Sequence, residues 1–316
     1  MNLTDPIFTD ERKARDFLEA SRWPDGPFCP HCGSVEKIYR LEDGGKHRDG
    51  LIHCNNCEGA FTVRTGTVME SSHIPLNKWV LAYRLMSGSK KGISALQMSR
   101  SLEIGYKAAW FLCHRIRESM RDVSGDKIGG AGKIVEADEV WIGGKPRKGV
   151  KGRTRRDDNK TPVAVLVERG KGGRVRATVV GKPLGGVLKR NIAANVAAGS
   201  DIHSDDHKAY RKTEKITGGR HEAVKHMIGE YARKTADGIS VHNNTAESWN
   251  ALLERSIIGA FHHVSPEHLP RYADEVEFRW NRREMNDSER TVAAIKGAEG
   301  KRLTYRRTGE GQSTKA

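Results

Sequence analysis

Two closely spaced pairs of cysteines constrain the N-terminal part of this chain more than any other feature of its sequence. Each pair has the pattern Cys-x-x-Cys, and 21 residues separate the pairs. Two thiolates on one such turn can meet a single tetrahedral ion, and this spacing is close to that of four-thiolate zinc sites. A block of about 45 residues buries too little apolar surface to be stable without such a cross-link. The sequence therefore predicts one structural zinc ion, bound by Cys29, Cys32, Cys54 and Cys57.

Disulfides or a redox-active Cys-x-x-Cys are the alternatives for these cysteines. The N-terminal stretch MNLTDPIFTDERKARDF contains acidic residues and lacks the apolar stretch of a signal peptide. The chain also has no run of about 18 apolar residues that predicts a membrane span. We therefore expect a cytoplasmic protein without membrane contact, in which paired cysteines bind metal more often than they form disulfides.

The excess of basic side chains predicts a polyanionic partner. The 316 residues contain 55 Lys and Arg against 40 Asp and Glu, a net charge of +15, and the isoelectric point is near 9.7. Such an excess of positive charge indicates what the chain binds rather than how it folds, and nucleic acid is the leading candidate.

The periodicity of apolar residues divides the chain into a helical part and an α/β part. Helical spacing covers 77–87 and 106–120, and a glycine-rich joint at 125–132 follows. Beyond the joint we expect strands at Ile134–Ile142, 161–167 and 174–180, a helix over 184–198, a short segment at 201–206, and helices at 246–261 and 266–283. Strands followed by helices predict an α/β fold with a mixed sheet.

Residues 92–116 have the layout of a helix-turn-helix. A short helix leads to a turn near 103–105, and a second helix begins at Tyr106 and Lys107. In such a unit the second helix enters the major groove, so we expect Tyr106 and Lys107 to face bases. Arg115, Arg117 and Arg121 would then reach phosphates. Packing within a helical bundle is the alternative interpretation.

Three acids interrupt the apolar strand expected at Ile134–Ile142. Burying an unpaired charge in such a strand costs folding free energy, so the presence of Glu136, Asp138 and Glu139 indicates a specific role for these acids. Side chains alternate across a strand, which places Glu136 and Asp138 on one face and Glu139 on the other. At most two of the three can therefore point at one site.

Two further acidic clusters follow, at 203–206 and 243–247. Carboxylates from separate strands and one helix can converge on divalent cations such as Mg²⁺. Simpler interpretations stay open. Asp205 and Asp206 fit ordinary turn acids, and Asn244 with Glu247 fits a helix N-cap and its capping-box partner.

Several stretches together resemble the IS1595 (ISXO2-like) family of insertion-sequence transposases, from about residue 23 to 284. The matching stretches are EADEVWIGGK at 136–145, SDDHKAY at 204–210, HNNTAESW at 242–249, GAFHHVS at 259–265, HLPRY at 268–272 and FRWNRR at 278–283. The resemblance implies an RNase H-like DDE catalytic domain after a zinc ribbon and a helix-turn-helix. We divide the chain into a leader helix (1–22), a zinc ribbon (23–68), a helix-turn-helix block (69–125), an RNase H-like domain (130–288) and a basic tail (289–316).

Carried over by position, the resemblance implies that Asp138, Asp205 and Glu247 are catalytic and bind Mg²⁺ or Mn²⁺, two ions in all. Members of the family carry Glu, Asn or His at the third place, so Asn244 is an alternative to Glu247. Glu136 is an alternative acid beside Asp138, limited by the alternation to a supporting role.

This chain departs from the family pattern on the last acidic helix. The family's lysine, seven residues after the third acid, is here Glu254, followed by Arg255. Arg255 is our candidate for the lysine's role toward phosphate, and an impaired copy is the alternative.

A basic loop lies between the first two expected strands. Residues 145–160 carry eight Lys or Arg against two Asp. A solvated surface is the usual explanation of such a run. Its place after Asp138 favours contact with DNA phosphates. The residues expected to make that contact are Arg147, Lys148, Lys151, Arg153, Arg155 and Arg156.

The sequence and the resemblance together predict a DNA transposase. We expect it to bind the terminal inverted repeats of its element and to join them to target DNA as a homo-oligomer. Two alternatives remain: a DNA-binding regulator that has lost the chemistry, and an RNase H-like nuclease that cuts without joining.

Overall fold

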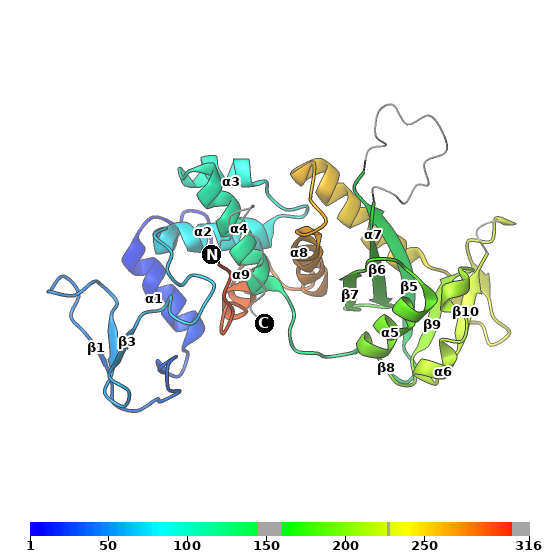
Figure 1. Cartoon of the computed structure of the whole chain (residues 1–316), viewed down its shortest axis with the longest axis horizontal. Helices are drawn as coiled ribbons and strands as arrows, with labels where there is room; N and C mark the ends of the chain where they lie inside the picture. The colour runs from blue at the N-terminus through cyan, green and yellow to red at the C-terminus, as the bar shows by residue number, and fades with distance from the viewer. Residues whose placement is uncertain (145–159, 226–227, 305–316) are drawn as a thin grey trace, which may run out of the picture. The chain divides into compact units, whose positions relative to one another are not determined.

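The computed structural model describes residues 1–144, 160–225 and 228–304, which fold into two units (Figure 1). The first unit contains residues 1–89, 93–120 and the chain from 287 onward. The second contains residues 90–92 and 121–286. None of the helices within the described ranges is long and apolar enough to cross a membrane.

The first unit combines a small antiparallel sheet with helices. Its strands, in the order β1-β2-β3, are β1 (Ile38–Arg40), β2 (Ile52–Cys54) and β3 (Gly59–Phe61). Its helices are α1 (Glu11–Arg22), α2 (Leu76–Gly88), α3 (Ala95–Leu102), α4 (Tyr106–Met120) and α9 (Asp287–Lys296). The helices predicted at 77–87 and 106–120 are confirmed to within one residue at each end.

Two helices of the first unit, α1 and α3, begin where a local side chain accepts hydrogen bonds from their first N–H groups. The Asp10 side chain accepts hydrogen bonds from the N–H groups of Arg12 and Lys13 at the start of α1. Ser94 caps α3 in the same way, and Glu103 ends that helix in the left-handed conformation. The turn at 103–105 between α3 and α4 lies where the sequence predicts it.

The predicted basic tail differs from the structure in its first part. Residues 287–296 form α9, whose buried stripe of Thr291, Ala294 and Ile295 packs against α2, α1 and α4. The segment after it stays attached, because Glu299 pairs with Arg22 and the N–H of Gly300 bonds to the carbonyl of Gly66. Small residues make most of this stripe, so its apolar period is weak in the sequence. Residues 305–316 lie outside the described ranges.

The second unit is built on a five-stranded mixed sheet in the order β10-β9-β5-β6-β7. Strands β5, β6 and β7 are antiparallel, whereas β9 and β10 run parallel to β5. These strands are β5 (Ile134–Ile142), β6 (Thr161–Glu168), β7 (Val175–Val179), β9 (Asp201–Asp205) and β10 (His221–Val224). The prediction for β5 is confirmed at both ends, whereas β6 is longer than predicted by one residue at its end and β7 is shorter by one residue at each end. Strand β10 was not predicted.

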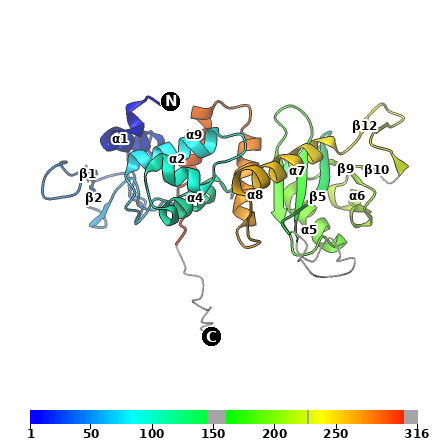
Figure 2. The same ribbon diagram turned by 90° about the horizontal axis from the view of Figure 1, so that it is seen from above.

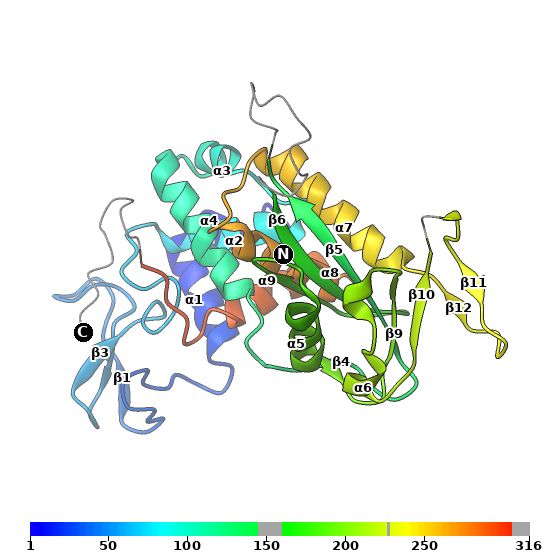
Figure 3. The same cartoon turned by 45° about the vertical axis from the view of Figure 1, so that its right-hand side comes forward.

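Helices cover both faces of this sheet (Figures 2 and 3). They are α5 (Gly185–Asn195), α6 (Glu214–Thr217), α7 (Asn244–Ser256) and α8 (Leu269–Asn281), and a π-helical turn (Ile257–Phe261) follows α7. Short strands complete the unit: β4 (Ile128–Gly129) pairs with β8 (Val196–Ala197), and β11 (Arg233–Lys234) pairs with β12 (Ser240–Val241).

Strand β5 divides its side chains between two cores. Val140 and Ile142 pack with Trp249 and Leu253 of α7. Val135 and Ala137 belong to the core on the opposite face, which includes Leu188 and Ile192 of α5. The mixed α/β architecture that the sequence predicts is therefore confirmed, and β5 is its central strand.

The burial of α9 generates the first testable prediction. Replacing Ile295 by Ala removes buried methyl and methylene groups from the contact with α2, so we expect the first unit to lose about 2–5 kcal/mol of unfolding free energy. Hydrogen exchange of the α2 amides in urea measures this loss. Lys296→Ala, on the exposed face of α9, is the control and should change stability by less than about 0.5 kcal/mol. Equal stability of the two variants would contradict the packing described.

Candidate metal centres

Four cysteines of the first unit form a cluster that fits one zinc ion. Their sulfur atoms all lie within 4.8 Å of one another. Cys29 and Cys57 are 3.6 Å apart and Cys32 and Cys54 are 3.7 Å apart, Sγ to Sγ. Four thiolates at about 2.3 Å from a tetrahedral ion are about 3.8 Å from one another. None of the four forms a disulfide, so the residues fit the predicted zinc site.

Hydrogen bonds shift the pKa values of the cluster in different directions. Burial by itself raises the pKa of the Cys54 thiol, but the N–H groups of Cys57 and Asn56, together with the Cys32 and Cys29 thiols, lower this pKa to about 7. The N–H of Gly59 lowers the pKa of Cys57, but burial and the neighbouring thiols raise it to about 12. His53 lies beside the cluster, but its Nδ1 is 2.9 Å from the side-chain oxygen of Asn55. Within the described ranges, the four cysteines form the only group of three or more Cys, His, Asp or Glu side chains whose ligand atoms lie this close together.

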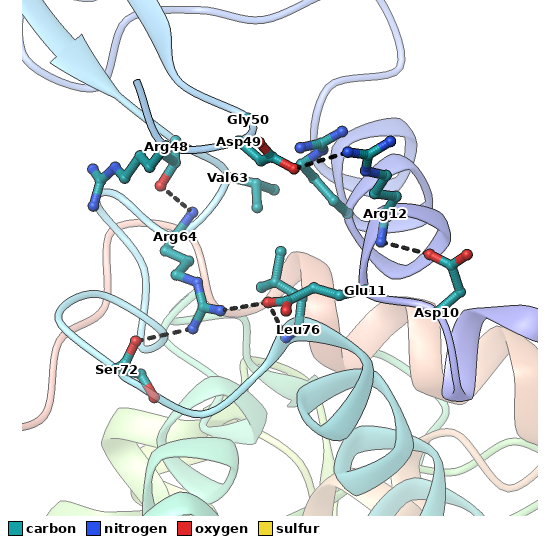
Figure 4. A pocket seen from close by; sticks show the side chains of 12 residues that line it. Asp10, Glu11, Arg12, Arg48, Asp49, Gly50, Val63, Arg64, Ser72 and Leu76 are labelled. Carbon is teal, nitrogen blue, oxygen red and sulfur yellow. Dashed lines mark hydrogen bonds and ion pairs between the residues drawn. The ribbon is translucent and has the colours of Figure 1, made fainter. Parts of the chain in front are cut away.

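A cavity of about 620 Å³ lies beside α1 in the same unit (Figure 4). Two of its arginines pair with acids of the wall. Arg64 lies 3.3 Å from Glu11 and Arg12 lies 3.4 Å from Asp49. Glu11 also accepts the N–H of Leu76, the first residue of α2. These contacts connect α1 to the zinc-binding segment and to α2.

Two of the predicted acids, Asp138 and Asp205, lie where β5 and β9 run side by side. The parallel pairing places Glu136 opposite His203 and Ala137 opposite Ser204. The next residues along the two strands are Asp138 and Asp205, which therefore share one face at about the 4.8 Å strand spacing. This is the face that α7 covers.

Asp138 is held by two hydrogen bonds and surrounded by negative charge. Its Oδ1 accepts the N–H of Glu139 at 2.8 Å, and its Oδ2 accepts the side-chain amide of Asn250 at 2.9 Å. Burial, followed by the charges of Asp205, Glu247 and Glu136, raises the pKa of Asp138 to about 7. A divalent cation neutralises such a cluster.

Glu247 lies in the first turn of α7 and is exposed. Its charge is one of those that raise the pKa of Asp138. The capping-box interpretation is wrong, because Asn243 rather than Asn244 is the N-cap and makes no capping bond through its side chain. Asn244 is exposed at the first position of the helix.

The other two acids of β5 are engaged by protein groups. Glu136 is fully buried and accepts hydrogen bonds from Arg169, Thr245 and Ala246. Glu139 lies on the opposite face of the strand, where it interacts with Tyr210, as the alternation predicts. Burial, followed by the charges of Asp138 and Asp205, raises the pKa of Glu139 to about 7, although the Tyr210 hydrogen bond lowers it.

Two contacts of this site were not found from the sequence. Asn250 lies three residues after Glu247, which places both on one side of a helix, and this spacing was the available signal. Arg169 follows β6 at a distance of 33 residues from its partner Glu136, and no local pattern connects them.

Glu254 and Arg255 are both exposed near the end of α7. Glu254 lines a cavity of about 880 Å³ together with Trp141, His262 and His263. The position that holds lysine in the family therefore presents a carboxylate here.

The predicted DNA contacts of the first unit divide into exposed and buried side chains. Tyr106 is 54% exposed and Lys107 is exposed at the start of α4. The prediction for Arg115 and Arg117 is wrong, because both are buried, and Arg115 stacks on the ring of Phe111. The predicted contacts of the basic loop, Arg147, Lys148, Lys151, Arg153, Arg155 and Arg156, lie outside the described residues.

Comparison with known proteins matches both parts of the chain that contain a candidate metal site. Residues 129–281 match the family model of the ISXO2-like transposase domain, and residues 9–59 match that of the transposase zinc-ribbon domain. The chain is also similar to an uncharacterized protein in transposable element ISH50 of Halobacterium salinarum. The two are 27% identical over 293 residues, which cover 86% of this chain and 91% of the relative. The matched ranges contain the four cysteines and the three acids.

The cysteine geometry predicts one zinc ion per chain. Replacing Cys54 by Ser removes one of four thiolates, so we expect zinc content to fall from one per chain to near zero and the amides of β1–β3 to lose protection from hydrogen exchange. Metal analysis of the purified protein measures the first effect. Cys113→Ala, which changes a buried cysteine outside the cluster, is the control and should retain the zinc. Full zinc content in the Cys54 variant would contradict the site.

Proposed function

The chain belongs to the IS1595 (ISXO2-like) transposase family, and we propose that it cuts and joins DNA at the ends of an insertion sequence by metal-dependent phosphoryl transfer. The observation that carries the proposal is the parallel pairing of β5 with β9, which puts Asp138 and Asp205 at adjoining ends of the two strands, on the sheet face covered by the helix that carries Glu247. The mixed order of the five strands, with the first acid on the central strand, supports an RNase H-like fold for this domain.

Asp138, Asp205 and Glu247 would hold Mg²⁺ or Mn²⁺, and their carboxylate oxygens are the ligands that these ions prefer. Two such ions activate a water or a 3′-hydroxyl and stabilise the leaving oxygen of a phosphodiester. Asn250 orients the Asp138 carboxylate by occupying one of its oxygens. Glu247 is favoured over Asn244 as the third ligand because its charge acts on Asp138.

The first unit would supply recognition of the terminal inverted repeats. Helices α3 and α4 with their short turn support a helix-turn-helix, and Tyr106 and Lys107 are exposed where the second helix begins. Arg255 stays a proposed phosphate contact on α7, and the six residues of the basic loop stay a prediction. Because two DNA ends are joined at once, we propose that the chain acts as a homo-oligomer.

A DNA-binding regulator without catalytic activity is the second candidate. Glu254 favours it, because an acid stands on α7 where the family carries a lysine that meets phosphate. An RNase H-like nuclease differs from both candidates by nicking DNA without joining it. Strand-transfer products with end-containing DNA separate the three functions.

Loss of a metal-binding acid should abolish strand transfer. We expect Asp138→Asn, Asp205→Asn and Glu247→Gln each to lower the rate at least about 100-fold, because each removes a charged ligand oxygen worth several kcal/mol. The assay uses end-containing oligonucleotides with Mg²⁺ and resolves nicked from joined products. Asp206→Asn, next to Asp205 and exposed, is the control and should retain activity. Asn244→Ala tests the alternative third ligand.

These outcomes decide the assignment of the site. Near wild-type activity in the Asp138 or Asp205 variant would overturn it. Full strand-transfer activity in the Glu247 variant, together with loss of activity in the Asn244 variant, would identify Asn244 as the third ligand in place of Glu247. No joined product from the unmodified chain, with specific DNA binding retained, would favour the regulator.

Helix α4 generates a separate prediction for DNA binding. Lys107→Ala should weaken binding to end DNA and reduce the slope of log affinity against log salt by about 1, because one phosphate or base contact is lost. Fluorescence anisotropy at several salt concentrations measures both quantities. Lys296→Ala removes an exposed lysine from α9 and is the control. Equal effects of the two variants on DNA affinity and its salt dependence would indicate that α4 is not the helix that contacts the DNA.

A further inference from the structure

Helix α7 is capped by side chains other than that of its N-cap residue, and the Nδ1 of His242 accepts the N–H of Asn244 at 3.4 Å. The first N–H groups of a helix need acceptors, and Asn243 at the N-cap provides none through its side chain. Glu136 of β5 provides them instead. Its Oε2 accepts the N–H of Thr245 at 2.7 Å and that of Ala246 at 2.9 Å, and its Oε1 accepts the Thr245 hydroxyl at 3.0 Å. A residue of the central strand thus caps α7.

Arg169 provides the countercharge of this buried carboxylate. Its Nε donates to Glu136 Oε1 at 2.8 Å. Its Nη1 donates to the carbonyl of Ser240 and its Nη2 to the carbonyl of His242, on the segment that leads into α7. Glu136 has no exposed surface, and an unpaired charge at such a place is strongly destabilising. Arg169 therefore connects the end of β6 to both Glu136 and the start of α7.

A second tether holds α7 further along the same strand. The Asn250 amide donates to Asp138, two residues after Glu136 on the same face of β5. Two residues of strand span about 6.8 Å and the five residues from Thr245 to Asn250 span about 7.5 Å of helix. The two tethers therefore match in spacing, and they oppose sliding of α7 along β5. Glu247 lies between them on the helix.

We propose that Glu136, paired with Arg169, is a positioning residue that fixes α7 on β5 so that Glu247 is held beside Asp138 and Asp205. The inference rests on the proposed function of those three acids. Glu136 itself stays outside the ligand set, because its two oxygens already accept four hydrogen bonds, about the capacity of a carboxylate. Binding a cation through Glu136 would release the first turn of α7.

The test compares Glu136→Gln with a matched variant of another buried carboxylate. Glu277 of α8 also accepts a hydrogen bond from an arginine, Arg176, and from a backbone N–H, that of Ala177, but none of these residues lies on α7 or β5. Glu277→Gln therefore changes a similar interaction elsewhere in the same unit. Both variants are studied as full-length, zinc-loaded protein at a temperature where each is folded.

Four measurements follow the consequences of the substitution. In Glu136→Gln we expect faster hydrogen exchange at the amides of Thr245 and Ala246, and a Kd for Mn²⁺ raised about 10-fold by calorimetry. The strand-transfer rate should fall about 10- to 100-fold at saturating DNA, with the Kd for DNA unchanged. Glu277→Gln should leave all four quantities near those of the unmodified chain. Arg169→Lys, which keeps the charge but loses the forked geometry, should shift them in the same direction as Glu136→Gln.

The results separate this inference from the proposed function. The positioning role of Glu136 would be overturned if the Glu136→Gln and Glu277→Gln variants had equal exchange rates at the amides of Thr245 and Ala246 and equal affinity for Mn²⁺. Loss of Mn²⁺ binding with unchanged exchange at Thr245 and Ala246 would also overturn it, by making Glu136 a ligand. Absence of strand transfer in the unmodified chain would contradict the proposed function, while exchange and Mn²⁺ affinity still decide the role of Glu136. If Glu136→Gln does not fold, Arg169→Lys decides by the same measurements.

Discussion

The second unit depends on how its central strand accommodates buried carboxylates. Strand β5 carries three acids into an apolar sheet, and each has a different environment. Glu136 caps a helix and pairs with Arg169, while Glu139 interacts with Tyr210 on the opposite face. Within the described ranges, Asp138 has only amide donors and no countercharge among its hydrogen-bond partners, and it lies on the face that α7 covers. Burial and then the charges of nearby acids raise its pKa to about 7. The proposed metal site rests on that environment.

The first unit depends on a cross-link and on the C-terminal segment of the chain. Four thiolates close the small sheet of the ribbon, since so short a segment has little core of its own. Helix α9 then packs against α2, so that residues nearly 200 positions apart share one core. Helix α9 is therefore part of the unit that contains α4, the helix proposed to contact DNA.

Patterns that are local in the sequence predicted most of these features. The bounds of β5, the cysteine cluster and the two faces of β5 follow from spacing and alternation, which depend on neighbouring residues. The sequence missed α9, because small side chains make its buried stripe, and it missed Arg169, because its partner lies on another strand. It also placed Arg115 and Arg117 on the surface, although both are buried. Burial of long basic side chains is decided by tertiary packing rather than by charge.

Asp138, Asp205 and Glu247 are proposed to form one cation site to which α7 contributes a ligand. Anomalous diffraction from crystals of the full-length protein grown with Mn²⁺ and end-containing DNA tests this proposal. We expect manganese density at the carboxylates of Asp138 and Asp205, with Glu247 as the ligand from α7 and Glu136 still bonded to the start of that helix. Manganese coordinated by Glu136 or Asn244 in place of Glu247, or absent from Asp138 and Asp205, would contradict it.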